Sequence, residues 1–325
     1  MPAVHQYIIF VFVFFISAFG LFGNIMVILA VRRHKDLKTK HGALLSFLCV
    51  YQSMVLVFEL LADARNIIKN VNSRSFCFYS LLPLTITYNV QLILLLVISL
   101  DLIFLVLKPT KYNSIEVYPY AYVVQAPCFT FALVFTVMGI LFSDRGYIIV
   151  CNIPLSYPNE LGSSWNICVI GVSVAIMSVY AATTSIMWFR DWQNVRKSEG
   201  ACVLDPSLRY QRKMMKTLSV LMSVFFCSGF ASALIILSPN LISSIDAHAS
   251  AYAQSYASIP ALISCAQNFY VYNAMSKDFH KAFKKNLIAL RKWKNAKLSQ
   301  SNSLFQVTKS ARRMSAKTVT VNSKQ

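Results

Sequence analysis

The stretch Cys77–Tyr112, CFYSLLPLTITYNVQLILLLVISLDLIFLVLKPTKY, decides the fold. Cys77 and Asp101 are 24 positions apart, and a helix covers about 36 Å over that distance, which exceeds the roughly 30 Å hydrocarbon core of a bilayer. The stretch therefore predicts a membrane helix with a thiol near one face and a carboxylate near the other. A carboxylate among apolar residues is costly unless it has a partner or a function, so Asp101 is a candidate functional residue. The alternative is a carboxylate at a helix end that reaches water.

The composition is that of a membrane protein. Of the 325 residues, 56% are hydrophobic and 13% are charged, which is unusual for a soluble domain. Seven apolar blocks are long enough to cross a bilayer, at about Tyr7–Val31, Gly42–Ala62, Phe76–Leu107, Pro119–Leu141, Trp165–Phe189, Thr217–Leu237 and Ser250–Tyr272. The first block has no lysine or arginine before it, so we expect a retained helix rather than a signal peptide. The pattern predicts an all-α membrane protein, a bundle of seven transmembrane helices.

The loop charges predict the orientation of the bundle. All but four of the 31 basic residues fall in alternate loops and in the C-terminal segment. The four exceptions are Arg65, Lys69, Arg74 and Arg145. By the positive-inside rule, the N-terminus is expected outside and the C-terminus inside, which requires an odd number of spans.

The chain outside the bundle is short and basic. The predicted parts are 1–6 as a short extracellular N-terminus, 7–272 as the bundle, 273–291 as an amphipathic helix on the inner leaflet, and 292–325 as a disordered cytoplasmic tail. Phe279, Phe283 and Leu287 recur at helical spacing among lysines, a pattern typical of a helix that contacts membrane lipids. Ser315 follows Arg312 and Arg313, so it is a candidate phosphorylation site. The alternative is an unmodified tail.

Two of the eight cysteines lie at the outer end of a membrane block or in an outer loop. Cys77 begins the third block, and Cys151 lies in the loop between the fourth and fifth. Both are expected in the oxidising compartment, where disulfides persist. The two positions therefore predict a disulfide that holds the loop over the bundle.

An ordered set of residues extends from Gly23 to Phe283. The set comprises Gly23, Asn24, Lys38, Thr39, Lys40, His41, Cys77, Asn89, Gln91, Asp101, Pro109, Tyr112, Cys151, Asn152, Pro154, Trp165, Asn166, Tyr180, Asn268, Phe269, Tyr270, Val271, Tyr272 and the segment Ser276–Phe283. This set resembles the rhodopsin-like G protein-coupled receptor superfamily, and most closely a nematode chemoreceptor of the serpentine receptor class SX. The resemblance implies a receptor in the plasma membrane, including that of sensory cilia. Such a receptor binds an external small-molecule cue and activates a heterotrimeric G protein.

The sequence departs from the superfamily pattern at four positions. Leu102 follows Asp101 where the resemblance implies an arginine, which puts the strength of G-protein coupling in question. Gln52 replaces an acid of the second helix, and a neutral amide is a poorer sodium ligand than a carboxylate, so we expect no sodium-dependent modulation. Gly229 occupies the usual position of a tryptophan in the sixth helix, and Phe269 that of a proline in the seventh.

Polar residues in the outer half of the bundle are the candidate ligand-binding residues. Thr85, Tyr88 and Asn89 share one face of the third helix. In the same way, Gln254 and Ser258 share a face of the seventh helix, and Glu59 contributes an acid from the second. The alternative is that these groups only hydrogen-bond between helices. Glu59 is expected to pair with Arg65 or with a cationic ligand, and the scarcity of basic residues favours a neutral or weakly cationic ligand.

The inner end of the bundle is the expected G-protein surface. The candidate residues for coupling and for the activation switch are Asp101, Leu102, Pro109, Tyr112, Tyr180, Asn268 and Tyr272. They would gate a cleft that opens when the sixth helix moves outward. For Tyr180 and Tyr272 the alternative is anchoring at the membrane interface.

Other classes of protein are less well supported by the sequence. The chain contains no hydrolase, P-loop or metal-binding motif, so we expect no enzyme activity, no cofactor and no metal site. We expect no nucleic-acid partner, because the net charge of +19 arises beside apolar blocks. Two alternatives stay open: a seven-span ligand-gated channel or transporter, and a receptor-like protein with weakened signalling.

Overall fold

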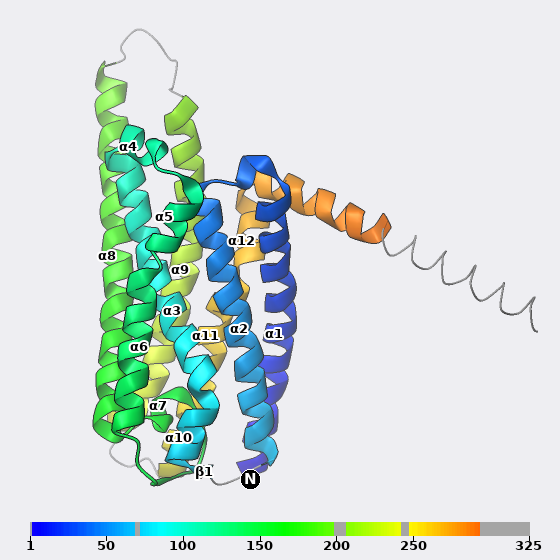
Figure 1. Cartoon of the computed structure of the whole chain (residues 1–325), viewed down its shortest axis with the longest axis vertical. Helices are drawn as coiled ribbons and strands as arrows, with labels where there is room; N and C mark the ends of the chain where they lie inside the picture. The colour runs from blue at the N-terminus through cyan, green and yellow to red at the C-terminus, as the bar shows by residue number, and fades with distance from the viewer. Residues whose placement is uncertain (1, 69–71, 198–205, 242–246, 293–325) are drawn as a thin grey trace, which may run out of the picture. The chain divides into compact units, whose positions relative to one another are not determined.

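The chain forms an all-helical bundle, as the sequence predicts. The computed structural model describes residues 2–68, 72–197, 206–241 and 247–292, and it divides the chain into two units, 1–280 and 281–325. In the first unit the long helices run side by side (Figure 1). They are α1 (Pro2–Arg33), α2 (Lys40–Ile68), α3 (Arg74–Leu107), α8 (Asn159–Lys197) and α9 (Pro206–Leu241). In the second unit, residues 281–292 are helical.

The fourth and seventh apolar blocks form interrupted helices. The fourth is divided into α5 (Val117–Val123) and α6 (Ala126–Leu141), and the seventh into α10 (Ala247–Tyr256), α11 (Ser258–Ala266) and α12 (Asn268–Met275). Pro127 lies in the first turn of α6, and Pro260 lies near the start of α11. Because proline lacks an N–H group and clashes with the preceding turn, a helix that reaches it tends to end or restart there.

Six helical stretches of the described chain are long and apolar enough to cross a membrane. They correspond to the first six predicted blocks, with α5 and α6 together forming one stretch. The three helices of the seventh block, α10, α11 and α12, are each too short to cross a membrane alone. The helices α8 and α9 begin before and end after the predicted blocks, because polar residues at a helix end extend the helix without extending its apolar part.

Short elements close the two ends of the bundle. At one end lie β1 (Asn72–Ser73), β2 (Tyr147–Ile148), α7 (Ile153–Ser156) and α10, and at the other lie η1 (Lys35–Leu37), α4 (Pro109–Ser114) and α5 (Figure 1). We call them the disulfide end and the α4 end. The helix α3 connects the two ends and packs against α2, α6 and α8.

Burial along α1 indicates a surface that faces lipid. Phe12, Phe15 and Phe19 are more than half exposed, as expected of side chains that contact hydrocarbon rather than water. On the other side of α1, Gly20 permits a close approach, because a Cβ atom there would lie 2.6 Å from Leu56 Cδ1. Small residues let membrane helices pack closely in this way.

Candidate functional site

A disulfide joins the loop before α7 to the start of α3. Cys77 and Cys151 are bonded, with their Cα atoms 5.6 Å apart, which confirms the predicted bridge. The side chain of Asn66 on α2 also holds the backbone of Cys151. Its Nδ2 donates to the Cys151 carbonyl at 3.0 Å, and its Oδ1 accepts from the Cys151 N–H at 3.3 Å. The loop is therefore tied to both α2 and α3.

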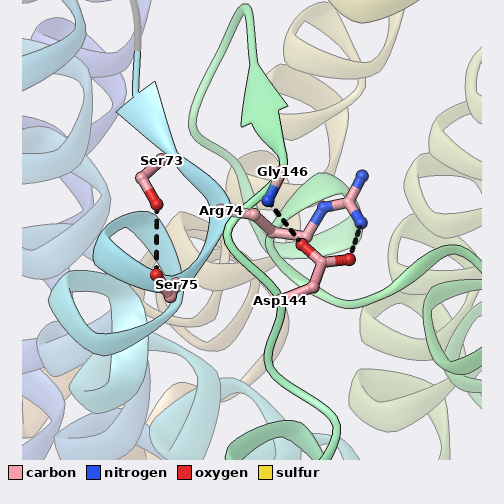
Figure 2. Close-up of polar contacts among 5 residues, drawn as sticks. All are labelled: Ser73, Arg74, Ser75, Asp144 and Gly146. Carbon is pink, nitrogen blue, oxygen red and sulfur yellow. Dashed lines mark hydrogen bonds and ion pairs between the residues drawn. The ribbon is translucent and has the colours of Figure 1, made fainter.

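A two-stranded antiparallel pair holds the same loop further out. Ser73 of β1 is paired with Tyr147 of β2, and Arg74 Nη1 lies 2.5 Å from Asp144 Oδ2. Figure 2 shows this ion pair together with the 2.9 Å hydrogen bond from the Gly146 N–H to Asp144 Oδ1. Because Asp144 is nearly half exposed, the pair positions the loop but contributes little stability.

Aromatic rings form the base of the loop. Tyr157 packs against Phe78, with ring centroids 5.4 Å apart, and against Trp165 at 6.0 Å. Burial raises the pKa of the Tyr157 phenol. Trp165 Nε1 donates to Asn89 Oδ1 at 2.9 Å, and its ring lies 5.8 Å from that of Tyr88. This cluster positions Tyr88 and Trp165 on facing helices.

Two adjoining cavities lie beside Tyr88 and Trp165, which line both. The first, the acidic cavity, has a volume of about 70 Å³. Its walls include Val55, Glu59, Tyr88, Asn152, Trp165, Gln254, Ser258 and Leu262. The second, the apolar cavity, has a volume of about 120 Å³. Its walls include Tyr88, Gln91, Leu95, Trp165, Phe225, Phe226, Gly229 and Phe230.

The structure brings together most of the predicted ligand-binding residues. Glu59, Tyr88, Gln254 and Ser258 all line the acidic cavity, although they come from α2, α3, α10 and α11. Thr85 and Asn89 lie outside the described walls of both cavities. Asn89 is fully buried and binds Trp165, so its part in the site is to position that ring.

Sequence reasoning missed several lining residues. Asn152 and Trp165 were part of the family resemblance but were not predicted to contact a ligand. Gly229 faces open space, with no atom within 4 Å of the position of a Cβ. The absence of a side chain there, noted in the sequence as a missing tryptophan, is what leaves room for the apolar cavity.

Arg65 is not the partner of Glu59, contrary to one sequence-based expectation. Arg65 Nη1 donates to Ser80 Oγ, and its guanidinium lies 5.9 Å from the Phe76 ring centroid. Glu59 instead interacts electrostatically with Asp63, one turn further along α2.

At the α4 end, Asp101 is the centre of a compact cluster. Asp101 is buried, and its carboxylate accepts hydrogen bonds from Tyr112 Oη at 3.0 Å and from Tyr120 Oη at 2.6 Å. Lys40 Nζ lies 4.2 Å from the Tyr112 ring centroid and 5.8 Å from that of Tyr120, and it donates to the Tyr112 carbonyl. We call these four residues the Asp101 cluster. It joins the ends of α2, α3, α4 and α5.

Tyr120 and Lys40 had no assigned role in the sequence-based prediction of this end. The available signal was the position of Lys40 at the start of an apolar block, next to the predicted inner face. Leu102, which replaces the expected arginine, is buried beside Asp101. The positive charge that compensates Asp101 therefore comes from α2 and not from α3.

The remaining predicted switch residues form separate contacts. Tyr272 Oη lies 3.0 Å from His41 Nε2, and Tyr180 Oη is hydrogen-bonded to Ser219 Oγ on α9. Pro109 begins α4. Asn268 lies deeper in the bundle and donates to Gln52 Oε1. These residues connect α12 to α2 and α8 to α9, but they do not converge on one point.

A polar hollow of about 280 Å³ opens at the same end. Its walls come from η1, α2, α9, α12 and the residues that follow α12. They include Asp36, His41, Thr217, Tyr272 and Asp278. The hollow lies next to the His41–Tyr272 contact, so a change in that contact alters the hollow directly.

The helices are those of a multi-pass helical membrane protein. A family model described as "Serpentine type 7TM GPCR chemoreceptor Srsx" matches residues 17–287. The chain belongs to this family, which confirms the resemblance found in the sequence and the expectation that the protein is not an enzyme. No curated protein matches the chain.

Proposed function

We propose that this receptor binds an external small molecule in the acidic and apolar cavities and activates a heterotrimeric G protein at the α4 end. The observation that carries the proposal is the pair of adjoining cavities next to the disulfide-bonded loop, walled by residues of α3, α8, α9 and α11. Small-molecule sites in helical bundles are commonly concave, mostly apolar and equipped with a few polar groups.

The walls of the cavities suggest how a ligand would act on the bundle. Phe226 and Gly229 belong to α9, and α9 is connected toward the other end by the Tyr180–Ser219 hydrogen bond. Gln267, between α11 and α12, donates to the Leu221 carbonyl of α9 at 3.2 Å. A ligand that contacts α9 and α11 together therefore biases the position of α9 relative to its neighbours.

The proposed G-protein surface comprises the Asp101 cluster and the polar hollow. In a resting receptor, the Asp101 cluster holds α2, α4 and α5 against α3. Without an arginine at Leu102, the cluster relies on Lys40 for its positive charge. Movement of α9 away from Tyr180 would enlarge the hollow beside His41 and Tyr272.

We place the disulfide end outside the cell and the α4 end inside, in the plasma membrane. The loop charges and the disulfide support this orientation. The helical residues 281–292 are proposed to lie on the inner leaflet with the lysines toward anionic lipid. Ser315 lies outside the described residues, and its phosphorylation stays a prediction from the sequence.

The test uses cells that express the full chain with a promiscuous Gα subunit. They are challenged with mixed small metabolites and odorants while G-protein dissociation and whole-cell current are recorded together. A ligand-dependent G-protein signal supports the proposal. A current that persists when the G protein is blocked would indicate a channel. Silence in both readouts at confirmed surface expression would leave two interpretations: a ligand missing from the mixture, or a receptor-like protein that has lost its coupling.

A matched pair of variants tests the site itself. Gly229→Trp fills the apolar cavity, because the Cβ position faces open space within the cavity wall. Gly171→Trp on α8 also has open space around it but is exposed and lies outside the described cavity walls. We expect the first variant to lose about tenfold or more in ligand potency and the second to retain it. Equal responses would exclude the apolar cavity as the binding site.

A further inference from the structure

We propose that the ligand is an organic amine that also carries an oxygen acceptor, and that its ammonium group binds beside Glu59 in the acidic cavity. This inference rests on the proposed receptor function and specifies the chemistry of its ligand. Four independent features of the cavity wall support it.

The first feature is an acid without a basic neighbour. Glu59 lines the cavity, and none of its described walls contains lysine, arginine or histidine. The closest arginine along α2, Arg65, is directed to Ser80 and Phe76 instead. A carboxylate-bearing ligand would be repelled here, whereas a cation would compensate the charge.

The second feature is an unused acceptor beside the acid. Gln254 Oε1 is buried and has no hydrogen-bond partner in the described part of the chain, and Gln254 lines the same cavity as Glu59. A buried acceptor without a donor is costly. An ammonium group is suited to both residues, since it brings up to three donors and no acceptor.

The third feature is the aromatic wall. The rings of Tyr88 and Trp165 lie 5.8 Å apart and both line the cavity. Aromatic faces attract ammonium groups, and indole does so most strongly. An inorganic cation fits less well, because apolar side chains such as Val55 and Leu262 form part of the wall and offer it no oxygen ligand.

The fourth feature predicts the second group of the ligand. Asn152 Oδ1 accepts a hydrogen bond from the Leu155 N–H at 3.0 Å. Its Nδ2 is buried without an acceptor among the described residues, and Asn152 also lines the cavity. This donor requires an oxygen acceptor, which a hydroxyl, ether or amide of the ligand would supply.

The experiment uses the purified full-length receptor in nanodiscs and measures its thermal unfolding. The probes are pairs that differ only in the charged group: phenethylamine with 2-phenylethanol, and tyramine with 4-(2-hydroxyethyl)phenol. We expect an amine to raise the unfolding temperature with a Kd at least about tenfold lower than that of its neutral partner. We expect tyramine, whose phenol supplies an oxygen acceptor, to bind more tightly than phenethylamine, which has no oxygen.

Variants show whether Glu59 binds the ammonium group of the ligand. Glu59→Gln is expected to weaken amine binding about tenfold to a hundredfold, as loss of a charge-assisted hydrogen bond does. Glu160→Gln is the matched control, because Glu160 is an exposed acid at the start of α8. If Glu59→Gln does not fold, Gln254→Leu removes the second acceptor and should weaken amine binding several-fold.

The inference is overturned if no amine stabilises the receptor, if the neutral partners bind equally well, or if Glu59→Gln retains amine affinity. Stabilisation by neutral compounds that Gly229→Trp abolishes would overturn the amine inference while preserving the proposed receptor function. Because unfolding is measured without a G protein, a receptor that binds amines but does not signal would be recognised separately.

Discussion

Tyr120→Phe should raise the signalling of the receptor in the absence of any ligand. Asp101 is 2% exposed, and Tyr120 provides the shorter of its two phenol hydrogen bonds, at 2.6 Å against 3.0 Å for Tyr112. The substitution removes this donor without changing the ring, so that a buried carboxylate oxygen loses its partner in the arrangement that holds α5 against α3.

The size of the effect follows from the charge on the acceptor. A hydrogen bond to a charged group contributes about 1.5–3 kcal/mol, which corresponds to a factor of about ten to a hundred in a two-state equilibrium. If about 1% of resting receptors are active, Tyr120→Phe should raise the active fraction to between about 10% and 50%. The bond is expected to break on activation, so its loss affects mainly the resting state.

The assay measures ligand-free G-protein dissociation, normalised to surface expression, together with the thermal stability of the purified receptor. Tyr118→Phe is the matched control, since Tyr118 lies on the same helix α5 and is 59% exposed. Equal basal signalling in Tyr120→Phe and Tyr118→Phe would refute the reasoning. Reduced stability without increased signalling would show that the Asp101 cluster supports the fold and not the switch.

Three further predictions concern the bundle itself. Cys151→Ala should lower the free energy of unfolding by about 2–5 kcal/mol and reduce surface expression. Cys227→Ala, at an exposed free cysteine, should change neither. Equal decreases in the unfolding temperature of the two variants would contradict this prediction. Gly20→Leu should destabilise the receptor, because a Cβ there lies 2.6 Å from a neighbouring side chain, and Gly171→Leu should be tolerated in the same assay. With Gln52 in place of an acid, thermal stability and ligand affinity should be equal in sodium and potassium chloride, and a sodium-specific shift would exclude this interpretation.

The sequence was sufficient to predict the helical fold class and the family, but the positions at which helices break depended on packing. Pro127 and Pro260 mark where helices were liable to be interrupted, but the structure also breaks the seventh block at Gln267. The Gln267 side chain donates to a carbonyl of α9, a contact between segments more than forty residues apart. No local pattern contains such a partner.

The candidate sites show the same division. Glu59, Tyr88, Gln254 and Ser258 could be selected one helix at a time, because helical spacing places polar residues on one face. The direction of Arg65 toward Ser80 could not be predicted, since it depends on how α2 and α3 pack. That no basic residue lines the acidic cavity beside Glu59 therefore became visible only in the folded chain.

The sequence by itself determined seven apolar blocks, the disulfide pair and the receptor family, because hydrophobic length, loop charge and cysteine position are properties of the chain read in order. The tertiary structure decided which groups surround Asp101, which acid faces a cavity wall without a basic residue, and where Gly229 leaves open space. These outcomes depend on side chains from helices far apart in the chain meeting at close distance. The strength of hydrogen bonds, electrostatic interactions and steric repulsion depends on that distance and not on separation along the sequence.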